Sequence, residues 1–161
     1  MHSLTDQQIR TCFINCSRLE AADLPLPADL DQTDWDRKDY LGWRDPRSPR
    51  RRGFVVIPTP HGPVGVVLYA AKPPTRSAKC AWCRDGQLSH PAVIYVAQRV
   101  GQAGHWGSTV GTRICENFQC SANVRQPPLC PPEGTEIADA VAERIAELQR
   151  RAQGFLVSVN S

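Results

Sequence analysis

The chain has 161 residues, of which 41% are hydrophobic, enough for one domain with a core of ordinary size. Its formal net charge of +3 is mildly basic, so the charge permits an acidic or ribosomal partner without requiring one. The first residues lack the apolar stretch of a secretory signal, and no run of 18 apolar residues occurs. These features argue against a secreted or membrane-spanning protein, and we expect a cytoplasmic protein whose cysteines stay reduced.

An amphipathic helix is predicted over residues 4–15. Thr5 is a suitable N-cap, and Gln8 stands three residues later, where a capping box places Glu or Gln. The apolar face of the predicted helix comprises Ile9, Cys12, Phe13 and Cys16. Cys12 and Cys16 have a spacing that permits metal ligation, but packing in the core is the preferred interpretation.

Residues 24–49 are rich in Pro and Asp and contain a dense group of aromatic side chains. The group comprises Trp35, Tyr40 and Trp43, and we expect it to anchor a loop to the core. A basic run follows, with arginines at Arg47, Arg50, Arg51 and Arg52. The run either contacts phosphate or forms a solvated loop tip between two elements, and the second interpretation is preferred.

Four β-strands are predicted, over residues 54–57, 64–71, 92–98 and 110–115. The first two flank a turn at 58–63 and are expected to form a hairpin, with His61 inert in the turn. Gly101, Gly104 and Gly107 separate the last two strands. Their spacing matches no phosphate-binding motif, so it indicates a loop.

Two helices are predicted in the last third of the chain. The first, over 116–125, is short because Gln126-Pro127-Pro128 stops it. The second is long, over 135–157, with Thr135 as its N-cap. Its apolar stripe comprises Ile137, Val141, Ile145, Leu148 and Ala152. We expect the stripe to pack on the sheet, which gives an α+β fold: a small antiparallel sheet with an N-terminal helix and a long C-terminal helix.

Four cysteines form the most informative pattern, arranged as Cys80-x2-Cys83 and Cys115-x4-Cys120. Zn²⁺ prefers a tetrahedron of thiolates, and a two-residue gap lets a tight turn present two sulfurs to one ion. Five positions along a helix correspond to roughly 140° of rotation, so Cys115 and Cys120 cannot share an ion from within one helix. Cys115 is therefore expected to end a strand, and Cys120 to lie in the following turn or first helical turn. This arrangement describes a treble-clef zinc finger over 79–125 with one structural Zn²⁺.

Disulfides, small buried side chains and an iron–sulfur cluster are the other interpretations of these cysteines. A reducing compartment disfavours disulfides, and no redox partner is evident for a cluster, so zinc is preferred. His90 and His105 are alternative ligands, but four cysteines already fill the tetrahedron, and Cys130 has no partner at metal-binding spacing. The negative charge of the zinc–thiolate group is offset by neighbouring cations at Lys79, Arg84 and Arg113.

No catalytic motif accompanies the cysteines. The sequence has no nucleophile elbow, no His-Glu-x-x-His, no Walker sequence, and no His-x-Glu before a Pro-Cys-x-x-Cys. A catalytic zinc also needs an open coordination position, whereas this ligand set is closed. We therefore predict a protein that is not an enzyme and has no small-molecule substrate.

Three stretches together resemble the FBP-domain family, the treble-clef zinc domain of elongation factor G-binding proteins of the fusidic-acid-resistance (FusB) type. They are Leu-Gly-Trp-Arg-Asp-Pro at 41–46, Cys80-x2-Cys83, and Val-Gly-Thr-Arg-Ile-Cys-Glu-Asn-Phe-Gln-Cys-Ser at 110–121. The resemblance covers about residues 5–157. It implies a single FBP-type domain over 1–161, with zinc ligands at Cys80, Cys83, Cys115 and Cys120.

The resemblance also implies a function in translation. Proteins of this family bind elongation factor G through the zinc domain and help to release it from the ribosome, with no chemistry of their own. The family presents aromatic and basic contact side chains within or beside the zinc finger. In this sequence the matching motif positions are Trp82, Arg113 and Phe118, so the resemblance implies that they bind the partner. The chain is expected to correspond to the C-terminal half of the resistance proteins, and Ser121 stands where the family often has Asn. We therefore do not extend the drug resistance of those proteins to this one.

The alternative function is that of an RNA- or ribosome-binding zinc protein. It would use exposed aromatics on single-stranded bases together with the basic run of Arg47, Arg50, Arg51 and Arg52. Steep salt dependence of RNA binding would favour it.

Overall fold

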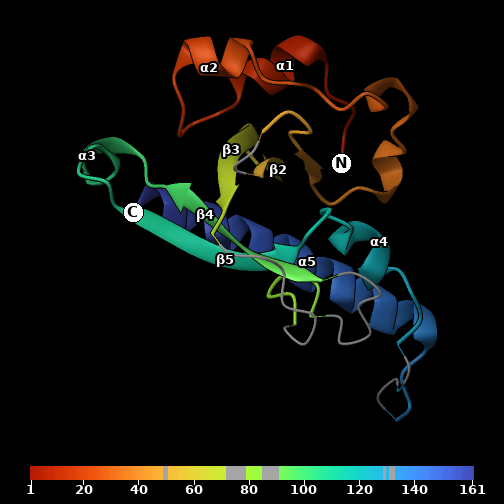
Figure 1. Ribbon diagram of the computed structural model, residues 1–161. Coiled ribbons are helices and arrows are strands. Elements are labelled where there is room, and N and C mark those ends of the chain that lie inside the picture. Colours follow the sequence, from red (N-terminus) through yellow and green to blue (C-terminus); the bar gives the residue numbers. More distant parts are fainter. Residues whose placement is uncertain (49–50, 72–78, 85–90, 129, 131–132) are drawn as a thin grey trace.

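A five-stranded antiparallel sheet forms the centre of the protein (Figure 1). The computed structural model describes residues 1–48, 51–71, 79–84, 91–128, 130 and 133–161. The strands follow chain order across the sheet: β1 (Leu41–Arg44), β2 (Arg52–Thr59), β3 (Gly62–Ala70), β4 (Ala92–Gln98) and β5 (Thr109–Cys115). The α+β class and the antiparallel sheet predicted from the sequence are confirmed.

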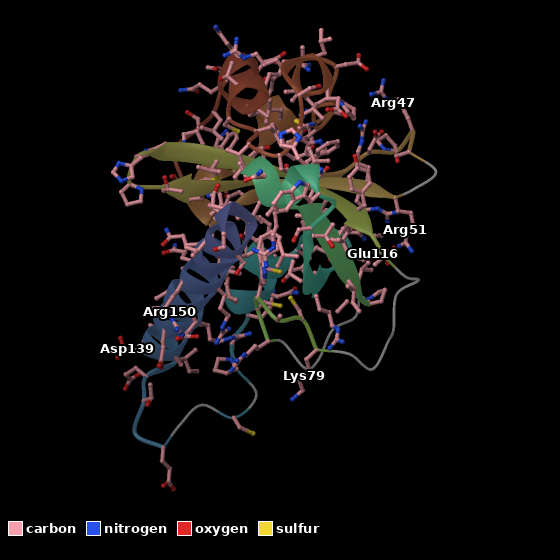
Figure 2. The ribbon with its side chains drawn as sticks, turned by 90° about the vertical axis from the view of Figure 1, so that its left-hand side faces the viewer. Arg47, Arg51, Lys79, Glu116, Asp139 and Arg150 are labelled. Atoms are coloured by element: carbon pink, nitrogen blue, oxygen red, sulfur yellow. The ribbon has the colours of Figure 1, made fainter. Side chains whose placement is uncertain are left out.

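Different parts of the chain cover the two faces of the sheet. The long helix α5 (Ile137–Asn160) lies along one face. The other face carries the N-terminal segment, which contains α1 (Asp6–Thr11), α2 (Arg18–Ala22) and the 3-10 helices η1 (Leu30–Gln32) and η2 (Trp35–Arg37). Figure 2 shows this segment on one side of the sheet and α5 on the other.

Strand β2 is buried on both faces. Val55 and Ile57 join the core beneath α5, whereas Phe54 and Val56 join the core beneath the N-terminal segment. Successive side chains of a strand point to opposite faces, so a strand covered on both sides is apolar without interruption. This burial explains the continuous apolar run that identified the strand.

The predicted N-terminal helix is present but shorter than expected. It spans Asp6–Thr11 instead of 4–15, and the capping box of Thr5 and Gln8 is formed. A second short helix, α2, has a capping box of its own that was not predicted, between Ser17 and Glu20.

Helix α1 ends early because the chain turns to bond with β3. The Gly65 N–H donates to the Cys12 carbonyl at 2.9 Å, and Phe13 forms an isolated parallel bridge with Gly65. The Phe13 ring then lies edge-on to the rings of Trp43 and Phe54. A Cβ atom at Gly65 would lie 2.9 Å from the Cys12 sulfur, so this approach requires glycine.

The Pro- and Asp-rich stretch contains a strand that the sequence did not indicate. Among the described residues, strand β1 pairs with β2 alone, and its four residues are too few to show a clear alternation. Its Trp43 packs on Phe54 with ring centroids 5.1 Å apart, and the indole N–H donates to the Pro25 carbonyl at 2.7 Å. The expected anchoring of this stretch by aromatic side chains is confirmed.

The glycine-rich stretch after β4 is a short helix, α3 (Gly101–His105), and not the predicted loop. Gly101 is its first residue and Gly107 follows its end, and their φ angles of +71° and +81° lie in a region that favours glycine. A Cβ atom at Gly104 would lie 1.8 Å from the Arg99 carbonyl oxygen. The glycines therefore let a helical turn fit tightly between β4 and β5.

The β2–β3 hairpin has a shorter turn than predicted. Its strands extend to Thr59 and Gly62, so only Pro60 and His61 lie between them, and His61 is exposed. Gly62 has a φ angle of +118° and provides the backbone conformation that closes this turn.

Both C-terminal helices differ from their predicted bounds. The short helix α4 (Cys120–Val124) begins at Cys120, because residues 116–119 form the turn before it. Helix α5 has Glu136 as its N-cap and not Thr135, and its predicted stripe is buried only from its middle onward, where it continues through Phe155, Leu156 and Val159. None of the helices in the described part of the chain combines the length and apolarity needed to cross a bilayer.

Candidate metal centre

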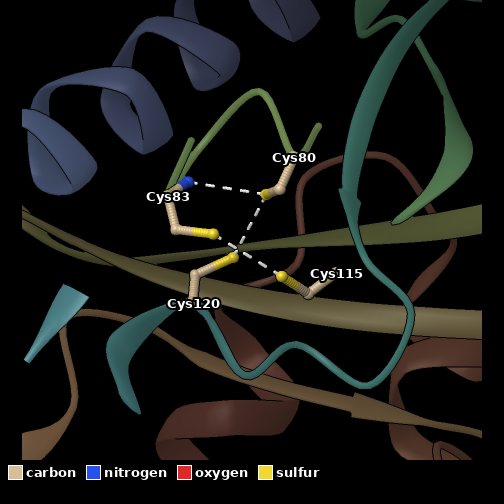
Figure 3. A group of neighbouring side chains, drawn as sticks. All are labelled: Cys80, Cys83, Cys115 and Cys120. Carbon is tan, nitrogen blue, oxygen red and sulfur yellow. Dashed lines mark hydrogen bonds between the residues drawn. The ribbon is translucent and has the colours of Figure 1, made fainter. Parts of the chain in front are cut away.

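The four cysteines come from three elements, as their spacing predicted. Cys80 and Cys83 lie in a tight turn at residues 79–84, Cys115 is the last residue of β5, and Cys120 is the first residue of α4. Figure 3 shows the four side chains converging on one point.

The sulfur positions fit a tetrahedral ion. The sulfurs of Cys80 and Cys120 are 3.6 Å apart, as are those of Cys83 and Cys115, and all four lie within 4.8 Å of one another. Zn–S bonds of about 2.3 Å give a tetrahedron with edges of about 3.8 Å. A disulfide would need about 2.05 Å, so the cysteines are free thiols and not cystines.

Two left-handed residues shape the turns that carry the sulfurs. Arg84 has a φ angle of 53°, and its N–H donates to the Cys80 carbonyl at 3.0 Å. Phe118 has a φ angle of 58°, and its N–H donates to the Cys115 carbonyl at 3.0 Å. Such angles are uncommon in bulky residues, so the surrounding packing holds both turns in place.

Neighbouring donors make the site suitable for thiolates. The Cys83 N–H points at the Cys80 sulfur at 3.4 Å, and the Asn123 side-chain amide donates to the Cys115 sulfur at the same distance. The Tyr40 hydroxyl is buried with no hydrogen-bond partner among the described residues. Burial raises the pKa of Tyr40, and the nearby Cys120 sulfur raises it further. A thiolate at Cys120 gives this orphaned hydroxyl an acceptor.

The cluster requires a cation to hold four thiolates. Hydrogen bonds from the Cys115 and Cys120 thiols lower the pKa of Cys80, whereas burial raises the pKa of Cys120. The ligands are all buried, and four negative charges at this separation repel one another strongly. A bound Zn²⁺ removes the conflict and leaves no open coordination position, which defines a structural site.

The fold and the site together define a treble-clef zinc finger with four cysteine ligands. Residues 8–159 match the family described as FBP C-terminal treble-clef zinc-finger. The match spans nearly the whole chain, so the protein belongs to this family. Searches of curated proteins and of solved structures found no match.

Trp82 and Phe118 lie in the core and not on the surface. Trp82 is 2% exposed, stands edge-on to Tyr40 at 5.0 Å and donates its indole N–H to the Thr112 hydroxyl at 3.0 Å. Phe118 is 5% exposed and packs on Tyr95 at 5.1 Å. Both rings are therefore held inside the protein, and a part of Trp82 and Phe118 in partner binding stays a prediction.

Arg113 is the remaining residue of the predicted contact set, and it is exposed on β5. Its backbone carbonyl accepts the Ala81 N–H at 2.7 Å, which attaches the first cysteine turn to the edge of the sheet. Lys79 and Arg84 are also exposed beside the ligands. The role of Arg113 in partner binding stays a prediction.

A buried carboxylate, missed in the sequence, connects the zinc finger to other parts of the fold. Asp39 accepts hydrogen bonds from the Arg125 guanidinium and from the Gln149 amide, and its N–H donates to the Ser121 hydroxyl at 3.0 Å. These partners are between 82 and 110 residues away in the chain. No local pattern could reveal such a contact.

The other candidate ligands lie away from the centre. Cys12 and Cys16 pack against the core beneath the N-terminal segment, which agrees with the preferred interpretation of this pair. Burial raises the pKa of Cys12 to about 12. His105 is exposed in α3, at the opposite end of β4 and β5 from Cys115 (Figure 1). Cys130 is exposed, and His90 lies outside the described residues.

Proposed function

We propose that this protein is a non-catalytic, zinc-stabilised binding module whose partner is elongation factor G, and that it acts in translation. The observation that carries the proposal is the match to the FBP zinc-finger family over residues 8–159. The identity of the partner is inferred from the resemblance of this sequence to elongation factor G-binding proteins with an FBP domain.

The geometry of the centre supports a non-catalytic role. All four corners of the tetrahedron are cysteine sulfurs, and each ligand is buried. A substrate therefore has neither an open metal position nor direct access to the ion. Zinc in such a site holds the two cysteine turns together and stabilises the surface around them.

The basic run gives the RNA-binding alternative limited support. Arg51 and Arg44 both pair with one carboxylate oxygen of Glu116, and Arg52 pairs with Asp45 at 2.7 Å. Arginines neutralised in this way contribute less to phosphate binding. Within the described part of the run, Arg47 has the most exposed side chain, at 62%. This arrangement favours a protein partner over RNA.

Calorimetric titration of the zinc-loaded protein with elongation factor G tests the proposal. We expect saturable binding with one partner per protein and a Kd in the micromolar range or tighter. A parallel titration with a ribosomal RNA fragment at two salt concentrations tests the alternative, since phosphate contacts weaken steeply as salt rises. No heat of binding with micromolar elongation factor G would contradict the proposal.

A further inference from the structure

The described residues cover only part of one face of the sheet. Phe54, Val56 and Val67 lie beneath the N-terminal segment, and the same face continues outward through β4 and β5. Strand register places Tyr69, Ile94, Val96, Gly111 and Arg113 on this continuation, and we call these five residues the open face. Val96 is half-buried and the other four are exposed. The exposed polar pair of Gln98 and Thr109 bounds the open face at one end.

The open face is more apolar than a water-facing strand surface. Tyr69 pairs with Val96, and Ile94 stands two residues before Val96 on β4. Tyr69 is 39% exposed and Ile94 is 36% exposed. Antiparallel sheets with one solvated face normally place polar side chains there, so three adjacent apolar side chains indicate a surface that another molecule covers.

No contact among the described residues explains Gly111. It lies in the middle of β5, opposite Val96, and its φ angle is not in the left-handed region. A Cβ atom there would meet the Tyr95 carbonyl oxygen at 3.7 Å and the Ile94 side chain at 3.9 Å, both ordinary contacts. Glycine weakens a strand, and a glycine that its own fold does not require is typical of close approach by another backbone.

The charges around the open face indicate which kind of molecule can bind there. Arg113 pairs with Ile94 across the strands and is the only ionisable cation among the five residues. Two further arginines lie beside Tyr69, and both have partners. Arg52, opposite Tyr69 on β2, pairs with Asp45. Arg99, which lines the neighbouring cleft with Glu20 and Gln98, donates to the Ser158 carbonyl. Arg113 is thus the arginine on the open face for which no side-chain partner is found among the described residues. One such arginine beside apolar side chains suits a protein segment with apolar residues and a carboxylate better than a phosphate backbone, which requires several cations.

We propose that the open face is the docking surface for a segment of the partner protein that carries apolar side chains and a carboxylate. The segment approaches most closely over Gly111, its apolar side chains cover Ile94, Val96 and Tyr69, and its carboxylate pairs with Arg113. This inference rests on the proposed function, because elongation factor G is the partner used to test it.

The test measures the affinity of the zinc-loaded protein and its variants for elongation factor G by calorimetry. Gly111→Val fills the space over the strand and is expected to weaken binding at least about tenfold, while the melting temperature stays equal or rises. Gly154→Ala is its matched control, because Gly154 is exposed in α5 and a Cβ atom there meets nothing within 4 Å. If Gly111→Val does not fold stably, the same measurement is made with Gly111→Ala, whose side chain is smaller.

A charge-reversal pair tests the second contact. Arg113→Glu is expected to weaken binding about tenfold. Arg37→Glu changes the net charge equally at an exposed residue of η2 and is expected to leave affinity unchanged.

The outcomes separate this inference from the proposed function. If the unaltered protein binds elongation factor G and the Gly111 and Arg113 variants bind equally well, the docking surface is wrong and the proposed function stands. If the unaltered protein does not bind the factor, the proposed function fails and the inference fails with it. If the same variants lose affinity for a ribosomal RNA fragment instead, the occupant is nucleic acid and the protein-segment inference is overturned.

Discussion

The zinc finger and the N-terminal segment are attached to the same sheet by different physical means. Around the finger, four sulfurs from three elements meet within 4.8 Å, so one ion fixes parts of the chain that are 40 residues apart. The N-terminal segment is instead held by a small apolar core in which Ile9, Phe13 and Trp43 meet Phe54 and Val67.

This difference determines how each region should respond to damage. A metal site depends on every ligand, so the loss of one sulfur removes most of its stabilisation at once. An apolar core loses stability in proportion to the contacts removed, and its short helices depend on caps worth about 1 kcal/mol each. The predicted effects therefore decrease from the zinc finger toward the N-terminal segment.

Replacing a zinc ligand should have the largest effect. Cys115→Ser leaves three thiolates and is expected to abolish stoichiometric zinc, because structural zinc contributes about 10–16 kcal/mol in zinc-finger peptides. Hydrogen exchange followed by mass spectrometry should show faster exchange in β4, β5 and α4 than around Ile9. Cys130→Ser, at an exposed cysteine, is the control and should keep one zinc per chain. Full zinc content in Cys115→Ser would contradict the four-ligand site.

Trp82→Ala should be the most damaging change near the finger that leaves the ligands intact. The ring is buried between Tyr40 and Phe155, so its removal is expected to cost about 3–5 kcal/mol of unfolding free energy. Urea unfolding measures this loss. Trp106→Ala is the control, because Trp106 is exposed and should change stability by less than about 0.5 kcal/mol. A stable Trp82→Ala protein with weakened partner binding would instead support the predicted role of Trp82 in partner binding.

Asp39→Ala tests the connection between the two regions. Removing this carboxylate leaves the Arg125 guanidinium unpaired in a buried setting, and breaking such a pair costs about 3–5 kcal/mol. Because Asp39 also accepts from Gln149 of α5, we expect faster hydrogen exchange in α4, in α5 and in residues 35–44 together. Asp36→Ala, at an exposed residue of η2, should leave all three unchanged. Faster exchange confined to residues 35–44 would show that Asp39 does not connect the regions.

The zinc finger was predictable because its information is local and chemically specific. Cysteine spacing alone placed Cys115 at the end of a strand and Cys120 in the following turn or first helical turn, and both placements are correct. Strand β4 was predicted with its observed bounds, because its alternating residues face a core and a more exposed surface.

The N-terminal segment was less predictable because long-range contacts determine it. Helix α1 ends at Thr11 because the chain bonds to Gly65, and β1 exists because β2 offers it an edge. The burial of Trp82 and Phe118 has the same origin. An aromatic residue beside a zinc ligand has the same sequence pattern whether it faces solvent or α5, and only the packed fold decides which.

The smallest expected effect concerns the second capping box, in which Glu20 accepts the Ser17 N–H. This hydrogen bond lowers the pKa of Glu20, so the ionised carboxylate stabilises the folded protein above the ordinary value of 4.5, and the contribution is lost as the pH falls through the lowered pKa. Glu20→Gln should therefore reduce the melting temperature slightly at pH 7, by a free energy well under about 1 kcal/mol since the group is exposed. The difference from the unaltered protein should shrink as the pH falls below 4.5 and disappear once the pH lies below the lowered pKa of Glu20. Zinc release on acidification affects both proteins equally and cancels in the comparison. Glu143→Gln, at an exposed residue of α5, is the control, and an equal loss in that variant would show that the effect comes from net charge and not from the cap.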